Sequence, residues 1–484
     1  MTELSTRRRM LVLAICCMSL LIVGMDNTIV NVALPSIRTS LSASVEGLQW
    51  TIDAYTLVLA SLLILAGSTA DRIGRRRTFQ TGLVLFTLGS LLCSVAPGLG
   101  WLVAFRMVQA AGGSMLNPVA MSIITNVFTD PKERARAIGV WGGVVGISLG
   151  LGPIVGGALT ETIGWRSIFW INVPIGIAAF VLAALFIPES RAPRARRVDP
   201  IGQLLVLVLL VAVTYAIING PRAGWGSVQT WGLFAVAVLA VLALLRYEPR
   251  RRDPLIELRF FRSVPFAGAT VIAVCAFGAF SGFLFLNTLY LQDVRHLSAL
   301  QAGLFLLPMA VVTSILAPVS GRVVGSRGPR IPLFIAGITM CFGATALTVL
   351  DSNTSYYWMV GGYIVFAIGF GMVNAPITNT AVSGMPRAQA GVAAAVASTS
   401  RQVGASLGVA IVGSVINSGS GGAISSNLAS ASHPGWWIIS GAGAAVLVLG
   451  LATSGQRARR SAERTAQLLE SETAERRDVM LSAS

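Results

Sequence analysis

The stretch LVLAICCMSLLIVGMDNTIVNVALPSI, residues 11–37, decides how the rest of the chain is interpreted. A helix rises about 1.5 Å per residue, so an apolar run over 10–37 is long enough to cross a hydrocarbon core of roughly 30 Å. The run contains one carboxylate, Asp26, and no Lys or Arg. Ionising an acid at that depth costs at least about 2.5 kcal/mol, so such a group usually carries a proton or holds a cation. We predict that Asp26 is a proton carrier; the alternative is a structural hydrogen-bonding partner.

The composition extends this interpretation to the whole chain. Its 484 residues are 54% hydrophobic and only 12% charged, against about 25% charged in soluble domains. A net charge of +16 would suggest nucleic acid in a soluble protein. Here the arginines cluster in short segments between apolar runs, which is typical of a protein oriented in a membrane. We therefore expect a lipid bilayer and no nucleic acid as a partner.

The apolar runs predict fourteen transmembrane helices. Their expected ranges are 10–37, 48–70, 78–97, 101–127, 135–160, 166–187, 201–219, 229–246, 264–290, 300–323, 331–350, 356–380, 388–417 and 434–453. Arginines gather before the first run and in every second connection, and the basic side of a membrane protein is the cytoplasm. Both termini are therefore expected in the cytoplasm, as an even number of crossings requires.

An internal repeat predicts two similar halves. GSTADRIGRR at 67–76 and GRVVGSRGPR at 321–330 each follow an apolar run on the basic side, as in transporters built from repeated bundles. The expected domains are an N-terminal six-helix bundle (1–190), a two-helix insert with its linkers (191–262), a C-terminal six-helix bundle (263–455) and a polar cytoplasmic tail (456–484). A short helix that frays into disorder is expected in the tail.

Few charged residues fall inside the predicted helices. Of the 20 acidic residues, only Asp26 and Asp53 lie well inside them. Arg106, in the fourth range, needs an acid, a carbonyl or water beside it, and both acids are expected at a similar depth. An arginine that approaches the ionised acid and leaves the protonated one would couple protons to conformation. The alternatives are a snorkelling role for Arg106, and for Asp53 attraction of a cationic substrate or a structural role.

Other side chains are expected to form a substrate cavity. Arg401 lies too deep in the thirteenth range to reach the surface, so it is expected to line the cavity or cap a broken helix. The aromatic and amide candidates for the cavity wall are Tyr55, Gln109, Trp141, Phe283, Asn287, Tyr290 and Asn374. The chain has no phosphate-binding loop and no metal-ligand spacing. We therefore expect no enzyme, no metal and no cofactor, with the proton gradient as the driving force.

Several motifs, in order, resemble those of the fourteen-helix drug:proton antiporters of the major facilitator superfamily. They are MDNTIVNVALPSI (25–37), GSTADRIGRRR (67–77), FRMVQAAGGSML (105–116), GLGPIVGG (150–157), WRSIFWINVPIG (165–176) and SRQVGASLGVA (400–410). The resemblance covers almost the whole chain. It implies an all-α membrane protein with the major facilitator fold: two six-helix bundles and two extra central helices. It also implies alternating access in a monomer in the bacterial inner membrane, with external protons exchanged for an internal drug.

The resemblance assigns roles to particular residues. Asp26 and Arg106 match the proton-linked positions, and Asp53 matches an acid of quaternary-ammonium exporters, implying cation recognition or a second proton site. The gating loop corresponds to Gly67, Asp71, Arg72, Gly74, Arg75 and Arg76, and the bend of the antiporter motif to Gly152, Pro153, Gly156 and Gly157. Asp71 is expected to hold the cytoplasmic side closed. Gly325 replaces the second gating acid, and the C-terminal half shows no membrane carboxylate.

The sequence therefore predicts a proton-coupled exporter of lipophilic cations or antibiotics. One alternative is a dedicated exporter of a single metabolite or self-made antibiotic. Another is a membrane receptor or scaffold that does not transport.

Overall fold

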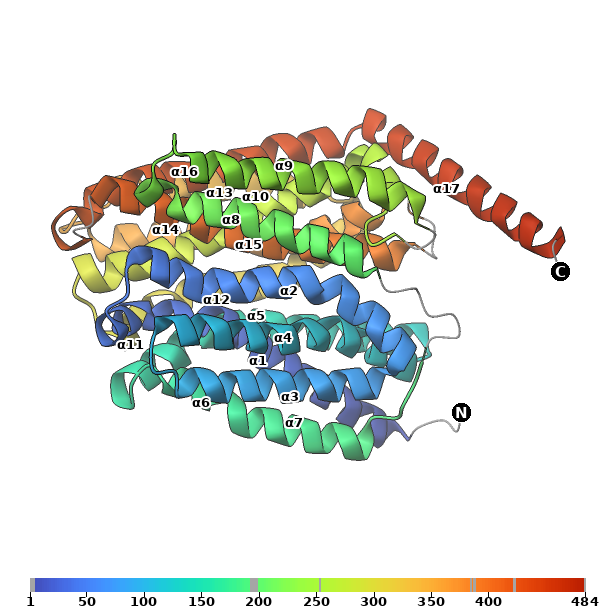
Figure 1. The fold of residues 1–484 in the computed structure, drawn as a ribbon, viewed down its shortest axis with the longest axis horizontal. Coiled ribbons are helices and arrows are strands. Elements are labelled where there is room, and N and C mark those ends of the chain that lie inside the picture. The colour runs from blue at the N-terminus through green and yellow to red at the C-terminus, as the bar shows by residue number, and fades with distance from the viewer. Residues whose placement is uncertain are drawn as a thin grey trace.

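The computed structural model describes residues 5–191, 199–251, 254–383, 385, 389–420 and 424–482, and it is helical throughout, without a strand in these ranges (Figure 1). The first helices are α1 (Thr6–Leu41), α2 (Val45–Ile73), α3 (Arg75–Ser94), α4 (Leu99–Val127), α5 (Pro131–Thr162), α6 (Ser167–Trp170) and α7 (Asn172–Phe186). Then follow α8 (Pro200–Ala223), α9 (Val228–Tyr247), η1 (Glu248–Arg250) and η2 (Leu258–Arg262). Arg194, Arg196, Arg197 and Arg252 of the basic connections lie outside the described residues.

The remaining helices belong to the second half and the tail. They are α10 (Val264–Leu289), η3 (Tyr290–Val294), α11 (Ala299–Phe305), α12 (Leu307–Arg327), α13 (Arg330–Ala346), α14 (Tyr356–Val382), α15 (Ala390–Ser420), α16 (Ile424–Thr453) and α17 (Gln456–Ser482). Each of the fourteen predicted ranges overlaps one helix, or two consecutive helices at α6–α7, α10–η3 and α11–α12. Ten helices in the described part are long and apolar enough to cross a membrane. The all-helical membrane fold is confirmed, while the count of fourteen crossings stays a prediction.

Several helices begin at residues suited to capping. The side chains of Ser44, Asp130 and Asp199 accept hydrogen bonds from backbone N–H groups in the first turns of α2, α5 and α8. Ser298 and Gln301 form a reciprocal capping box at the start of α11. These side chains satisfy donors that a helix leaves free at its N-terminus.

The tail differs from its expected short helix. It forms α17, which runs to Ser482 and projects from the same end of the bundle as the N-terminus (Figure 1). Its start is anchored to the second half, because the backbone N–H of Val264 donates to Ser461 Oγ over 3.0 Å. Opposite charges three and four residues apart, namely Glu463 with Arg460 and with Arg459, favour continued helix.

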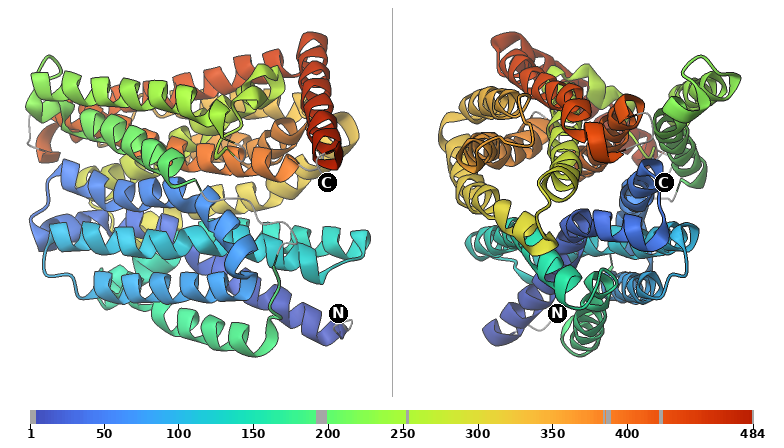
Figure 2. Two further views of the ribbon diagram at one scale, coloured as in Figure 1. Left: turned by 45° about the vertical axis from the view of Figure 1, so that its right-hand side comes forward. Right: turned by 90° about the vertical axis from the view of Figure 1, so that its left-hand side faces the viewer.

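The helices form two groups with a pair beside their junction (Figure 2). Helices α1–α7 pack with one another, and α10–α16 form the other group. The insert helices α8 and α9 pair, and α8 contacts both α2 and α15, one helix from each group. The aromatic rings of Trp50 in α2 and Tyr215 in α8 lie 5.6 Å apart. The insert therefore covers one edge of the junction between the halves.

The two groups are joined by polar contacts at the end away from the termini. Arg38 at the end of α1 makes two hydrogen bonds, of 2.8 and 2.9 Å, to the carboxylate of Asp293 in η3. Glu161 in α5 accepts a 2.7 Å hydrogen bond from the Ser298 hydroxyl before α11. The side chain of Gln49 in α2 donates to two backbone carbonyls of α15. These contacts hold that end closed.

A cavity of about 320 Å³ lies between the groups nearer the termini. Its wall is formed by residues in the C-terminal halves of α2 and α4 and near the start of α15. The residues just before α8 and in the connection after α9 complete it. Asp71 and Asp199 are its acidic residues, and Leu63, Leu255 and Val392 are among its apolar ones. The space between the halves is therefore reached from the end where the chain begins and ends.

Candidate functional site

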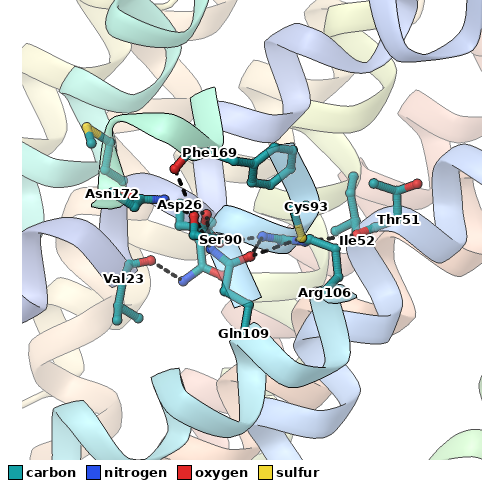
Figure 3. Close-up of polar contacts among 12 residues, drawn as sticks. Val23, Asp26, Thr51, Ile52, Ser90, Cys93, Arg106, Gln109, Phe169 and Asn172 are labelled. Carbon is teal, nitrogen blue, oxygen red and sulfur yellow. Dashed lines mark hydrogen bonds and ion pairs between the residues drawn. The ribbon is translucent and has the colours of Figure 1, made fainter. Parts of the chain in front are cut away.

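Asp26 lies at the centre of a buried polar cluster (Figure 3). Its side chain has no exposed surface. One carboxylate oxygen lies 2.5 Å from Arg106 Nη1, and the other accepts a 2.8 Å hydrogen bond from Gln109 Nε2. Arg106 Nη1 also donates to Gln109 Oε1 over 2.8 Å. The structure thus brings together three predicted site residues from α1 and α4, and the charges of the acid and the arginine compensate each other.

Two further residues complete the cluster (Figure 3). Asn172 Nδ2, at the start of α7, donates to Asp26 over 3.3 Å and to Ser90 Oγ in α3 over 3.0 Å. Ser90 Oγ in turn donates to the backbone carbonyl of Phe169 over 3.0 Å. The sequence analysis did not single out Ser90 or Asn172. The available signal was weak: an amide in the apolar motif WRSIFWINVPIG.

Arg106 is enclosed on its other sides as well. Its guanidinium carbon lies 4.1 Å from the centre of the Tyr55 ring and 5.8 Å from that of Phe169, distances at which an aromatic face attracts a cation. Its Nε donates to the backbone carbonyl of Thr51 over 3.3 Å. The residue is 1% exposed, so in this conformation Arg106 does not snorkel to the membrane surface.

The small residues of the antiporter motif place α5 against both halves. A Cβ atom on Gly152 or Gly156 would collide with α1. A Cβ atom on Gly157 would lie 2.5 Å from the backbone oxygen of Ala299 at the start of α11. Pro153 lies inside α5 between these contacts. Close approach of these helices depends on the missing side chains, so the motif joins the helix that carries Asp26 to the second half.

Two residues of the gating loop lie on the wall of the larger cavity near the termini. Gly67 and Asp71 line its wall, and Asp71 pairs with Arg75 Nη2 of its own half over 3.2 Å. Arg72 is exposed. In this conformation the Asp71–Arg75 pair joins the end of α2 to the start of α3.

A residue missed by the sequence analysis supports this loop. Glu189, after α7, accepts hydrogen bonds from the backbone N–H groups of Arg76 (3.1 Å) and Arg77 (3.3 Å). It therefore caps the N-terminus of α3, where negative charge is favourable. Gly74 has φ +127°, and a Cβ atom there would lie 2.5 Å from the Glu189 carboxylate. Glycine meets both requirements at this turn.

A second, smaller cavity lies between the halves beside the buried cluster. Its volume is about 90 Å³, and its wall is formed by Asn27, Thr28, Val30, Asn31, Ile52, Tyr55, Thr56, Arg106, Leu149, Phe277, Phe280, Ser281, Leu284, Gln402, Ala405 and Val409. We call it the central cavity. Of the predicted cavity residues, Tyr55 belongs to this wall, and so does the predicted coupling residue Arg106.

Three other cavity candidates lie within the second half and not on this wall. Phe283 stacks on Phe366 with ring centres 4.9 Å apart. The Asn287 side chain accepts a hydrogen bond from the hydroxyl of Tyr363. Tyr290 is buried and its hydroxyl donates to the backbone carbonyl of Asp351. Phe283 and Asn287 thus pack α10 against α14, and Tyr290 of η3 bonds the connection that precedes α14.

The remaining candidates are spread over several helices. Arg401 donates to the Thr378 hydroxyl, and its guanidinium lies 5.8 Å from the ring of Phe277 on the central cavity. Trp141 is partly buried against the core of the first half, and Asn374 is exposed on α14.

Asp53 is separate from the Asp26 cluster. It is fully buried in α2 and faces Ser406 of α15. Within the part of the chain that the structure describes, neither carboxyl oxygen has a hydrogen bond of good geometry. Asp53 therefore lies at the junction of the halves, and it lines neither of the two cavities.

Comparison with known proteins places this arrangement in a family. The model of the Major Facilitator Superfamily matches residues 16–409. The chain is 35% identical over 410 residues to the multidrug resistance protein Stp of Mycobacterium tuberculosis, covering 85% of this chain and 76% of that one. It is also 35% identical over 415 residues to the tetracenomycin C resistance and export protein of Streptomyces glaucescens, covering 86% and 77%.

Solved structures show the same fold. A bacterial homologue of the human lysosomal transporter Spinster, in an inward-facing and occupied conformation, aligns with a TM-score of 0.67 and 18% identity over 96% of this chain and 98% of that one. A peptide transporter in complex with sulfate aligns with a TM-score of 0.67 and 15% identity, covering 93% and 95%. With the matching helices and motifs, these findings establish that the chain belongs to the Major Facilitator Superfamily and is a multi-pass membrane protein of that transporter family.

Proposed function

We propose that the chain is a proton-coupled antiporter that exports drugs, either lipophilic cations or antibiotics, across the bacterial inner membrane by alternating access. Relatives named for multidrug resistance, tetracenomycin C export and puromycin resistance support the drug-export part of the proposal. The proposal includes fourteen crossings, cytoplasmic termini, a monomer, and the two six-helix bundles with the insert between them.

One observation carries the coupling. Arg106 belongs both to the buried cluster around Asp26 and to the wall of the central cavity between the halves. A proton on Asp26 removes the charge that holds Arg106, so the guanidinium loses its partner beside the place where a substrate would lie. Proton and substrate therefore both act on Arg106. Binding of one then changes the affinity of the transporter for the other.

This arrangement suggests a cycle. With the outer end closed, substrate enters from the cytoplasm while Asp26 is ionised and paired with Arg106. After the transporter turns outward, an external proton binds Asp26 and the substrate leaves. The protonated transporter returns, and the proton leaves Asp26 to the cytoplasm. Asp53 at the junction of α2 and α15 is a second proton site or a cation-recognition site in this proposal.

The test is proton exchange in proteoliposomes loaded with a pH-sensitive dye. We expect addition of a transported drug to drive proton movement in the wild type and none in Asp26→Asn. Glu463→Gln, at an exposed acid of α17, is the control and should behave as wild type. Full drug-driven proton movement in Asp26→Asn would remove Asp26 from the mechanism.

A dedicated exporter of one compound is the second candidate. Relatives named for resistance to single antibiotics, including methylenomycin A, favour it. A resistance profile restricted to one compound on overexpression would support this candidate, and a broad profile would support multidrug export. A non-transporting receptor or scaffold predicts no proton movement with any compound.

A further inference from the structure

The wall of the central cavity has an unusual charge pattern for a drug site. Arg106 is its charged residue, and none of the lining residues, all of which the structure describes, is Asp or Glu. A cation leaving water needs an opposite charge close by to offset its lost hydration. The charge of Arg106 is already balanced by Asp26 behind it, and the wall has no acid of its own, so a permanent cation would find only aromatic faces there, a weaker compensation than a carboxylate.

The nearest acids do not supply the missing charge. Asp26 is engaged by Arg106, Gln109 and Asn172, and does not reach the wall. Asp53 is enclosed where α2 meets α15 and does not line the central cavity.

The acids on the inner approach are also paired. In the larger cavity near the termini, Asp71 lies 3.2 Å from Arg75. Asp199 lies 3.8 Å from Arg251, and its other oxygen accepts a 3.0 Å hydrogen bond from the hydroxyl of Tyr247. A cation moving inward along this path would meet carboxylates already compensated by arginines.

The wall does offer flat aromatic surfaces. Phe280 stacks on Phe370 with ring centres 4.0 Å apart and an interplanar angle of 5°, and Phe277 meets Phe370 edge-on at 5.3 Å. This packing holds Phe277 and Phe280 in fixed orientations beside the cavity, ready to stack on an aromatic ligand.

The wall also has unused neutral hydrogen-bonding groups. Among the described residues, the buried Asn31 Oδ1 and the Tyr55 hydroxyl have no hydrogen-bond partner. Leaving such groups unpaired costs about 1–3 kcal/mol each, so a ligand that bonds them gains affinity. The volume of about 90 Å³ is below the roughly 300 Å³ of usual ligand pockets, so the cavity admits one end of a larger molecule.

From these observations we infer that the central cavity selects uncharged aromatic compounds bearing carbonyl and hydroxyl groups, and discriminates against permanent cations. The inference rests on the proposed function and narrows its substrates to neutral aromatic antibiotics. Stacking on Phe277 and Phe280 provides the binding surface, while Asn31 Oδ1 accepts a hydrogen bond from a ligand hydroxyl and the Tyr55 hydroxyl donates one to a ligand carbonyl.

A matched pair of probes tests this selection. The uncharged probe is 6-(hydroxymethyl)-2-methoxy-1,4-naphthoquinone, and the cationic probe carries a trimethylammonioethyl group in place of the methyl of the methoxy group. Binding is measured by calorimetry with the purified full chain in lipid nanodiscs, and transport in proteoliposomes with a pH gradient. We expect the uncharged probe to bind at least tenfold more tightly to the wild type.

Charge-swap variants make the test specific. Asn31→Asp adds a carboxylate with almost no change of shape, and should improve binding of the cation about tenfold while weakening the quinone. Asn219→Asp, in α8 away from the cavity, is the control because its amide donates only to the nearby carbonyl of Tyr215. If Asn31→Asp does not fold, Ser281→Asp on the α10 side of the wall serves the same purpose.

The outcomes separate this inference from the proposed function. Tighter binding of the cation by the wild type, or an unchanged preference in the charge-swap variants, overturns the inference even if proton-driven export is observed. If the wild type prefers the cation and Asp53→Asn loses this preference, Asp53 is the cation site and the inference is overturned. The expected preference without proton-driven transport would support the inference and contradict the proposed function.

Discussion

The two halves of the molecule fill their centres in different ways. The first half has an ionic cluster in which Asp26, Arg106, Gln109 and Asn172 are all buried. The second half has aromatic rings at its centre, with Phe283 contacting Phe366 and also Trp436 at 5.3 Å. Between Asp293 and Glu463 the sequence has a single acid, Asp351, in the connection between α13 and α14. The difference teaches that the buried acids available for proton chemistry in the two described halves, Asp26 and Asp53, both belong to the first half, while the second half contributes packing and aromatic cavity wall.

The largest effect is expected from breaking the ionic cluster on one side. Arg106→Met leaves the Asp26 charge buried without its partner, so it should abolish proton exchange and destabilise the fold by about 3–5 kcal/mol. The double variant Asp26→Asn with Arg106→Met removes both charges and should recover most of that stability without recovering exchange. Thermal unfolding in detergent, with proton exchange in proteoliposomes, measures both effects. Equal stability of the single and double variants would contradict a compensated ion pair.

A change in the aromatic core should affect stability alone. Phe283→Ala removes a fully buried ring and should cost about 3–5 kcal/mol. Drug-driven proton exchange per folded molecule should stay near the wild-type value, because Phe283 lies outside the central cavity wall. A selective loss of exchange at unchanged stability would show that the second half takes part in coupling.

The junction between the halves should respond at Gly157. Gly157→Leu forces a side chain against the backbone of α11 at Ala299, and overpacking of this kind costs about 1–3 kcal/mol. Since the close contact exists with the outer end closed, the variant should favour the outward-open state. Accessibility of a cysteine introduced at Asn31 to an external thiol reagent measures this shift. If the introduced cysteine is less accessible in Gly157→Leu than in the otherwise identical protein with Gly157, the contact at Gly157 does not belong to the state with the outer end closed.

A smaller effect is expected at the cap of α3. Glu189→Ala removes the acceptor for two backbone N–H groups, which should cost about 1 kcal/mol and loosen the gating loop. Glu257→Ala, in which the lost partner is the nearby Arg259 at 2.7 Å, is a control outside the loop. Hydrogen exchange of the α3 N-terminus should rise in the first variant and remain unchanged in the second.

The smallest effect concerns the isolated acid of the second half. Hydrogen bonds from the Thr354 side chain and the Asn353 N–H hold the pKa of Asp351 below its usual range. A carboxyl group whose pKa is lowered by folding stabilises the fold above its unfolded pKa and loses that contribution as the pH falls through the folded one. In Asp351→Asn the melting temperature should therefore fall slightly less than in the wild type as the pH is lowered into the acid range. A profile identical to wild type would show that this loop contributes nothing measurable.

The sequence predicted the helices, and a buried partner for Arg106, for clear physical reasons, while the choice of Asp26 over Asp53 came from the structure. Long apolar runs leave few alternatives to transmembrane helices, and the isolated charges of Asp26 and Arg106 need partners at the same depth. The positions of Ser90 and Asn172 could not be predicted in this way, because a hydroxyl or amide in an apolar run has many acceptable surroundings. Glu189 was missed since its contacts lie more than a hundred residues away.

The cavity candidates on α10 show a further limit. This helix is apolar on all sides, with Phe283 and Phe280 three residues apart, so the sequence contains no signal for which face meets the cavity. The structure turns Phe280 to the cavity wall and Phe283 to the core. Only packing against α14 and α15 decides that rotation.

The most direct test of the account is the number of protons released when a transported compound binds the purified protein in weak buffer near neutral pH. If proton and substrate compete through Asp26 and Arg106, binding should release a measurable number of protons, at most one per molecule through this site, from the wild type, and none from Asp26→Asn that still binds. The same proton release from Asp26→Asn would contradict the account.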